Sequence, residues 1–127
     1  MKVFLDANIL FSAADAQSKT SEVLSELVSS GHEAVTNVYA WDETERNLMK
    51  KRPHMLRGFE DLRGLVEIVD TSLARLDVEC EEKDMAILAG AIDAGCSHLW
   101  TGDKKHFGKF YGKRIHGLLV VPSVPLF

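Results

Sequence analysis

The chain has few of the residues that would point to an oxidising compartment, a zinc site or a membrane. Its two cysteines, Cys80 and Cys96, form no CxxC pair, so we expect both to be buried, reduced and structural. The five histidines show none of the short spacings of zinc ligands. No apolar run could span a bilayer, and "MKVFLDANIL" is unlike a secretory signal. We therefore expect a cytoplasmic protein that is not bound to a membrane.

The composition is that of one ordinary globular domain. A length of 127 residues suits a single hydrophobic core, and no low-complexity tract or Gly/Ser linker divides the chain. We therefore treat residues 1–127 as one domain. The net charge of −4 argues against uniform affinity for nucleic acid, so any such binding has to come from local patches.

Short apolar, β-favouring stretches alternate along the chain with stretches of helical spacing. We predict strands at residues 2–6, 33–36, 65–70, 98–103 and 117–122. We predict helices at residues 18–30, 37–51, 55–64 and 82–95. Strands separated by helices usually pair in parallel. The predicted fold class is therefore α/β, a three-layer α/β/α sandwich around a central, mostly parallel five-stranded sheet.

The helix at 37–51 has an apolar side and ends at a proline. Val38, Trp41 and Leu48 are expected to form its apolar stripe. Pro53 cannot continue the helix, because it lacks a backbone N–H.

Four acidic residues occupy positions that can meet at one edge of this sheet. Asp6 and Asp103 stand where predicted strands end, and function in parallel sheets collects beyond the carboxyl ends of the strands. Glu43 lies about two turns into the helix at 37–51, and Asp84 lies in the first turn of the last predicted helix. The pattern predicts a carboxylate cluster.

Such a cluster needs a cation or a proton. Two carboxylates about 4 Å apart repel each other by on the order of 4 kcal/mol at an effective dielectric constant of roughly 20. Mg²⁺ and Mn²⁺ prefer oxygen ligands and suit a carboxylate cage better than Zn²⁺ does. An ion of this kind can activate water for attack on a phosphodiester, so the cluster predicts metal-dependent phosphodiester hydrolysis.

Four stretches carry a family resemblance. "VFLDANIL", "VTNVYAWDETERNL", "KDMAILAGAIDAG" and "HLWTGDKKHF" resemble, in that order, the four acidic motifs of the PIN-domain nucleases. Each motif alone is modestly specific, but their order and spacing together are a strong signal. The resemblance extends from Val3 to the tail "LLVVPSVPLF".

The resemblance implies a Mg²⁺- or Mn²⁺-dependent endoribonuclease, most often the toxin of a type II toxin–antitoxin pair of the VapC kind. By motif position, Asp6, Glu43, Asp84 and Asp103 would be the catalytic residues that hold the metal and its attacking water. The expected partners are an RNA substrate, a cognate antitoxin and, because many small PIN proteins dimerise, a second copy of the chain.

Asn8, Thr36 and Thr101 fall on polar positions that would support this site. Asn8 is equally suited to cap a helix, and the two threonines are equally suited to be ordinary strand-end residues.

Two details of the motifs leave the metal site open. His106 stands where related chains often carry another acid, so the number of bound metal ions, one or two, stays open. In the second motif Asp42 and Glu45 compete with Glu43, which we prefer because it faces away from the apolar stripe and fits the spacing.

Two basic stretches adjoin the second and fourth acidic motifs. From them we predict RNA-binding roles for Arg46, Lys50, Lys104 and Lys105. Phe110 and Tyr111 are candidates to stack on unpaired bases. For Phe107 we expect packing in the core.

Two other functions fit parts of the pattern. A PIN-like protein without catalysis would bind RNA or an antitoxin through the same surface. A phosphoacceptor receiver domain also alternates strands and helices around a strand-end aspartate, but "VFLDANIL" lacks its extra acidic pair and "LLVVPSVP" lacks its lysine.

Overall fold

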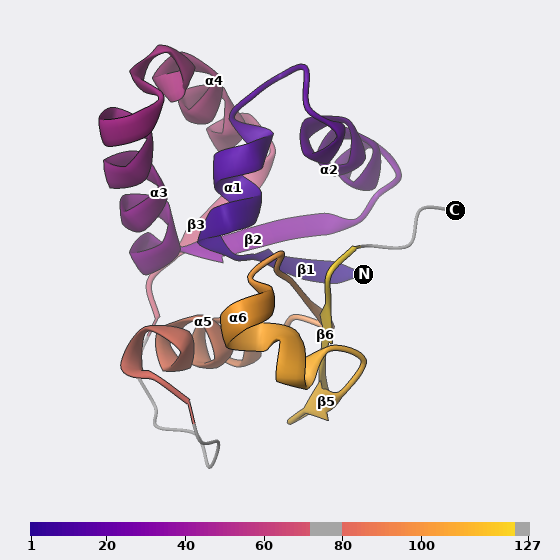
Figure 1. The fold of residues 1–127 in the computed structure, drawn as a ribbon. Coiled ribbons are helices and arrows are strands. Elements are labelled where there is room, and N and C mark those ends of the chain that lie inside the picture. Colours follow the sequence, from indigo (N-terminus) through magenta and orange to yellow (C-terminus); the bar gives the residue numbers. More distant parts are fainter. Residues whose placement is uncertain (72–79, 124–127) are drawn as a thin grey trace.

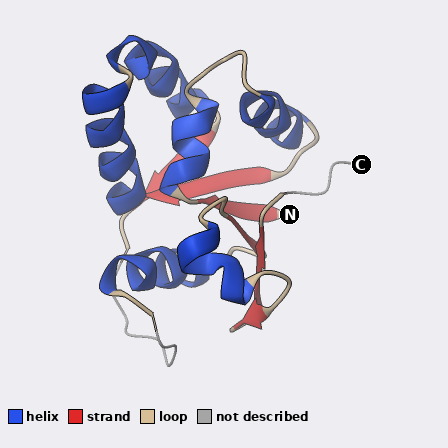
Figure 2. Cartoon of the chain, viewed as in Figure 1, coloured by secondary structure: helices blue, strands red, loops and turns tan. Residues whose placement is uncertain are grey.

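The computed structural model describes residues 1–71 and 80–123, so the last four residues of the PIN-like tail lie outside the described part. Figures 1 and 2 show a sheet with helices on both faces, which confirms the predicted α/β sandwich. The strands are β1 (Lys2–Leu5), β2 (Glu33–Asn37), β3 (Val66–Val69), β4 (His98–Trp100), β5 (Arg114–Ile115) and β6 (Leu118–Val121). The helices are α1 (Ala7–Ala13), α2 (Lys19–Ser29), α3 (Val38–Lys51), α4 (Leu56–Asp61), α5 (Glu82–Asp93) and α6 (Lys104–Phe107), with 3₁₀ turns at Pro53–Met55, Leu62–Gly64 and Gly108–Phe110.

Strands β1 and β4 lie side by side at the topological switch point of the sheet. From β1 the chain continues through β2 to β3 on one side, and β5 and β6 lie on the other side, beyond β4. The order is β3-β2-β1-β4-β6-β5, and every pair except β5 with β6 is parallel. Helices α1 to α4 lie on one side of the sheet, whereas α5 lies on the other and leads back to β4 (Figure 1). The carboxyl ends of β1 and β4 therefore meet at the switch point, where ligands bind in sheets of this type.

The sheet has six strands, so the prediction of five was wrong. The additional strand, β5, has two residues and pairs antiparallel with β6 through a turn at His116 and Gly117. Both turn residues have positive φ, 50° and 86°, which is the backbone of a tight hairpin. Two residues are too few to show an alternating pattern in the sequence.

The apolar stripe of α3 was predicted partly wrongly. Trp41 and Leu48 are buried, but Val38 is 40% exposed. The buried face consists of Ala40, Trp41, Thr44 and Leu48. At about 100° per residue these four span one narrow face, and Val38 lies roughly 60° beyond its edge.

The two cysteines differ in burial. Cys96 is buried, and burial raises the pKa of its thiol to about 11, which suits an inert structural residue. Cys80 is only half-buried, so the predicted burial holds for Cys96 alone. Within residues 1–71 and 80–123, no helix has the length and apolar character needed to cross a bilayer.

Helix α4 packs against the end of α1 at a glycine. A Cβ on Gly58 would lie 2.2 Å from the backbone oxygen of Ala14, whereas a Cβ on Gly64 would meet nothing within 4 Å. We predict that Gly58→Ala lowers the free energy of unfolding by about 1–3 kcal/mol, because the two backbones must separate. Gly64→Ala should stay within about 0.5 kcal/mol of the wild type. Urea unfolding followed by tryptophan fluorescence measures both, and equal effects would contradict this packing.

Candidate active site

All four predicted acids line one cleft at the carboxyl ends of β1 and β4. The cleft has a volume of about 330 Å³. Its lining residues are Asp6, Ala7, Asn8, Tyr39, Glu43, Asn47, Lys83, Asp84, Ile87 and Asp103. The acids reach it from four separate elements: the end of β1, α3, α5 and the loop after β4. The fold thus brings together carboxylates that are up to 97 positions apart in the sequence.

Asp6 ends β1 and begins α1. Its Oδ1 accepts a hydrogen bond of 2.7 Å from the backbone N–H of Ala7, which makes it the N-cap of α1. The alternative in which Asn8 caps a helix was therefore wrong for α1. The other oxygen of Asp6, Oδ2, accepts from the Thr101 hydroxyl at 2.7 Å and from the Asn8 side-chain amide at 3.0 Å.

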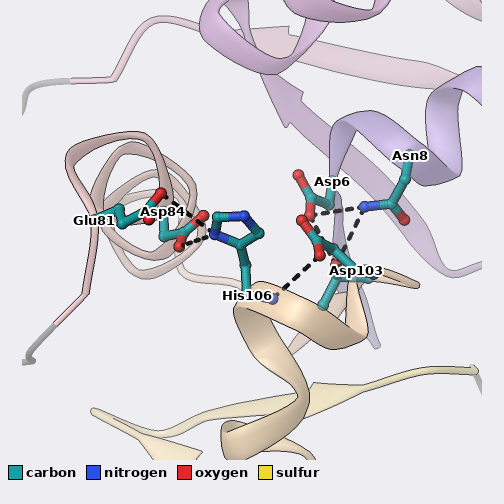
Figure 3. Close-up of polar contacts among 7 residues, drawn as sticks. Asp6, Asn8, Glu81, Asp84, Asp103 and His106 are labelled. Carbon is teal, nitrogen blue, oxygen red and sulfur yellow. Dashed lines mark hydrogen bonds and ion pairs between the residues drawn. The ribbon is translucent and has the colours of Figure 1, made fainter.

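Asn8 and Thr101 hold the loop after β4 against Asp6. Figure 3 shows the Asn8 side-chain amide directed at the Asp6 carboxylate. The Asn8 side-chain oxygen accepts from the backbone N–H of Gly102 at 2.7 Å. The Thr101 hydroxyl accepts from the N–H of Asp103 at 3.1 Å, and the Tyr111 hydroxyl donates to the Thr101 carbonyl at 2.9 Å. This network fixes the position of Asp103 in the loop after β4.

Asp6 is 5% exposed, and its charge is poorly compensated. Burial raises the pKa of its carboxyl above the ordinary value, and the charges of Glu43 and Asp103 raise it further. The hydrogen bonds from Thr101 and Ala7 oppose this rise but do not cancel it. No ion pair to Asp6 occurs among the described residues. The site therefore has an excess of negative charge.

Asp84 and Asp103 are joined by His106. Ring atom Nδ1 of His106 lies 2.8 Å from Oδ2 of Asp84, and its backbone N–H donates to Oδ1 of Asp103 at 3.1 Å (Figure 3). Asp84 itself is 4% exposed. Glu81 approaches the same ring nitrogen at 3.5 Å. His106 thus connects α6 to α5 and contacts two of the four acids.

The remaining predicted residues lie outside the cleft lining. The Thr36 hydroxyl donates a hydrogen bond of 2.9 Å to the carbonyl of Leu5, the residue that precedes Asp6. Phe107 is 1% exposed, which confirms its place in the core. The predicted RNA-binding residues Arg46 and Lys50 are exposed on α3, and Lys104 and Lys105 are exposed on α6.

Sequence reasoning missed three polar residues of the cleft, Tyr39, Asn47 and Lys83. Tyr39 and Asn47 lie four positions before and after Glu43 on α3, so all three share one side of the helix. That spacing was visible in the sequence and could have identified Tyr39. Lys83 lies beside Asp84 in the first turn of α5 and is the one cation among the lining residues. Its position depends on how α5 packs, which the sequence alone does not give.

The donor set fits a hard divalent cation. Four carboxylates face one cleft with a single lysine, and burial, together with the charges of Glu43 and Asp103, raises the pKa of Asp6. Oxygen ligands of this kind suit Mg²⁺ or Mn²⁺. Glu81, Asp84 and His106 also have ligand atoms within 4.8 Å of one another. Because this second group includes an imidazole nitrogen, its chemistry suits Mn²⁺ better than Mg²⁺.

The buried charge of Asp6 predicts a pH-dependent difference between wild type and Asp6→Asn in EDTA. Because the folded state raises the pKa of Asp6, its stabilising contribution is complete below the pKa of the unfolded chain and is lost as pH rises through the raised pKa. Asparagine can cap α1 without a charge. The stability of Asp6→Asn relative to wild type should therefore increase as the pH rises above about 4, the ordinary pKa of an aspartate.

Urea unfolding at several pH values measures this difference. Asp42→Asn is the matched control, since it removes an exposed carboxylate of α3 that does not line the cleft. A stability difference between Asp6→Asn and wild type that stays constant with pH would contradict the buried charge.

The sequence matches no protein-family model and no curated protein, but solved structures share its fold. A chain of VapBC2 from Rickettsia felis, bound to a DNA fragment from its promoter, has a TM-score of 0.71 and 18% identity, over 94% of this chain and 97% of that one. A chain of VapBC-1 from nontypeable Haemophilus influenzae has a TM-score of 0.59 and 17% identity, over 94% and 96%. VapC20 of Mycobacterium tuberculosis, a sarcin-ricin loop cleaving toxin, has a TM-score of 0.54 and 16% identity, over 81% and 92%.

At these identities the similarity is one of fold. The matches cover nearly the whole of the solved chains, and their fold agrees with the PIN resemblance of the four acidic motifs. The chain therefore has a VapC-like PIN fold.

Proposed function

We propose that the protein is a Mg²⁺- or Mn²⁺-dependent endoribonuclease that hydrolyses RNA phosphodiester bonds. The observation that supports this most is the convergence of Asp6, Glu43, Asp84 and Asp103 on one cleft. Structural neighbours with the same fold include a toxin that cleaves the sarcin-ricin loop. A cluster of four carboxylates without a matching set of cations is an expensive arrangement for fold stability alone.

Asp6, Glu43, Asp84 and Asp103 would hold the metal. When bound, such an ion lowers the pKa of water and neutralises charge on a phosphoryl group. The Thr101 hydroxyl and the Asn8 amide orient the Asp6 carboxylate through their hydrogen bonds. His106 orients Asp84 and, through its backbone, Asp103.

Basic residues near the cleft would bring in the substrate. Arg46 and Lys50 on α3, and Lys104 and Lys105 on α6, are exposed and can bind phosphates along an RNA strand. The Thr36 hydroxyl would act indirectly, by fixing the Leu5 carbonyl next to Asp6.

We also propose a toxin–antitoxin role. Two of the structural neighbours are VapBC proteins, which supports a cognate antitoxin as the partner of this chain. We propose a cytoplasmic location as well, since RNA and an antitoxin would both be met there. The same proposal includes a homodimer.

Cleavage of single-stranded RNA tests the proposal. Purified protein with Mn²⁺ or Mg²⁺ should cut a mixed-sequence RNA or a sarcin-ricin loop RNA, and EDTA should abolish the activity. Asp6→Asn and Glu43→Gln should each lose about 10²-fold or more, because each removes a metal-binding charge. Products are resolved on denaturing gels.

Two controls make the result interpretable. Asp42→Asn changes the charge next to Glu43 without touching the cleft and should keep most of the activity, which also tests the choice of Glu43 in the second motif. Asp6→Asn, purified identically, reveals contaminating nuclease. If Asp6→Asn cleaves as well as wild type, the chain is a PIN-like module that binds RNA or antitoxin without catalysis.

A further inference from the structure

One aromatic ring stands at the mouth of the cleft. Tyr39 lies in the first turn of α3, lines the cleft and is 41% exposed. It precedes Glu43 by one helical turn, so the two side chains are neighbours on the surface of α3. A large aromatic side chain that is half in a polar cleft and half in solvent does not serve core packing. It is available to contact a bound molecule.

Two cations act electrostatically on Tyr39. Lys83, on the opposite wall formed by α5, lines the same cleft, and Arg46 follows Tyr39 by two turns on α3. Burial, and then the charge of Glu43, raise the pKa of the Tyr39 hydroxyl, and both cations oppose this rise. Neither cation forms an ion pair with any residue in the described part of the chain. Both charges are thus available to a ligand.

The charge arrangement favours a polyanion as that ligand. The floor of the cleft is acidic, so a phosphodiester that approaches it needs positive charge at the rim as well as at the centre. Lys83 supplies this charge from α5 and Arg46 supplies it from α3. A basic peptide would be attracted by the floor but repelled by this rim. RNA therefore fits the rim better than a basic segment of protein.

We propose that Tyr39, Lys83 and Arg46 form a rim that positions single-stranded RNA, with an unpaired base stacked on the Tyr39 ring and the flanking phosphates on the two cations. This inference rests on the ribonuclease function proposed above. Every base has a face that can stack on an aromatic ring, so the contact tolerates many sequences. A base inside a duplex is already stacked on both sides, so the rim selects unpaired segments.

Binding in EDTA tests the rim separately from catalysis. The probe is a fluorescent 12-nucleotide RNA of mixed sequence, used single-stranded and as a duplex, with fluorescence anisotropy as the readout. Tyr39→Leu should weaken single-strand binding about 5- to 100-fold, the range expected for one stacked base, and leave duplex binding unchanged. Tyr39→Phe should bind like the wild type, because the ring remains. Val38→Ala, which trims an equally exposed neighbour outside the cleft lining, should also bind like the wild type.

The cations are tested by salt dependence. Lys83→Gln and Arg46→Gln should each reduce the slope of log K against log salt by about 0.7, the value for one phosphate contact on a single strand. Lys113→Gln, an exposed lysine outside the cleft, should leave the slope unchanged.

Three results would overturn the proposal. Equal losses of single-strand and duplex binding in Tyr39→Leu would remove the role of base stacking. A loss in Tyr39→Phe as large as in Tyr39→Leu would assign the effect to the hydroxyl. If Lys83→Gln left RNA binding unchanged but tightened binding of an oligoarginine peptide, the rim would belong to a basic protein partner. None of these binding measurements depends on hydrolysis. A result that contradicts the proposed RNA contacts is therefore distinguishable from an absence of nuclease activity.

Discussion

The burial of a single carboxylate, Asp6, constrains the centre of this molecule. A buried aspartate without a cation destabilises a fold, and here its neighbours Glu43 and Asp103 make the burial worse. The structure partly offsets this with three hydrogen bonds, from Ala7, Asn8 and Thr101. Ala7 and Asn8 lie in the first turn of α1, and Thr101 lies in the loop after β4. The need to satisfy Asp6 therefore sets how β1, α1 and the loop after β4 fit together.

The second strand repeats this construction with an amide in place of a carboxylate. Asn37 ends β2 and caps α3 by accepting from the N–H of Ala40 at 2.9 Å. Its side-chain amide donates to the Ala86 carbonyl of α5 at 3.1 Å. A Cβ on Gly90 of α5 would lie 2.5 Å from that amide nitrogen, so the close approach of α5 needs glycine at this position. A neutral cap thus seats α5, and with it Asp84, against the sheet.

The sequence was informative where elements are long and where a side chain follows a strand directly. Helices α2, α3 and α5 have clear periods, the central strands are apolar, β-favouring runs, and Asp6 and Asp103 could be located at strand ends without a structure. Helix α6 and strand β5 have four and two residues, which is too short for any period to be read. Lys83 was missed because only the packing of α5 determines what its first turn faces. In the sequence, His106 stands where related chains often carry another acid. In the structure, it bridges Asp84 and Asp103.

Two of the strand-to-helix connections at the cleft are extremely short. The two ends of the sheet therefore differ in how well they tolerate insertions. One residue, Asp6, separates β1 from α1, and no residue separates β2 from α3. An insertion at either junction would rotate a cleft side chain away from its partners. The hairpin at His116 and Gly117 is exposed, and its backbone already adopts a turn. New chain termini, fused domains or peptide insertions are therefore compatible with the hairpin between β5 and β6, whereas the β1–α1 and β2–α3 junctions beside the acids admit none.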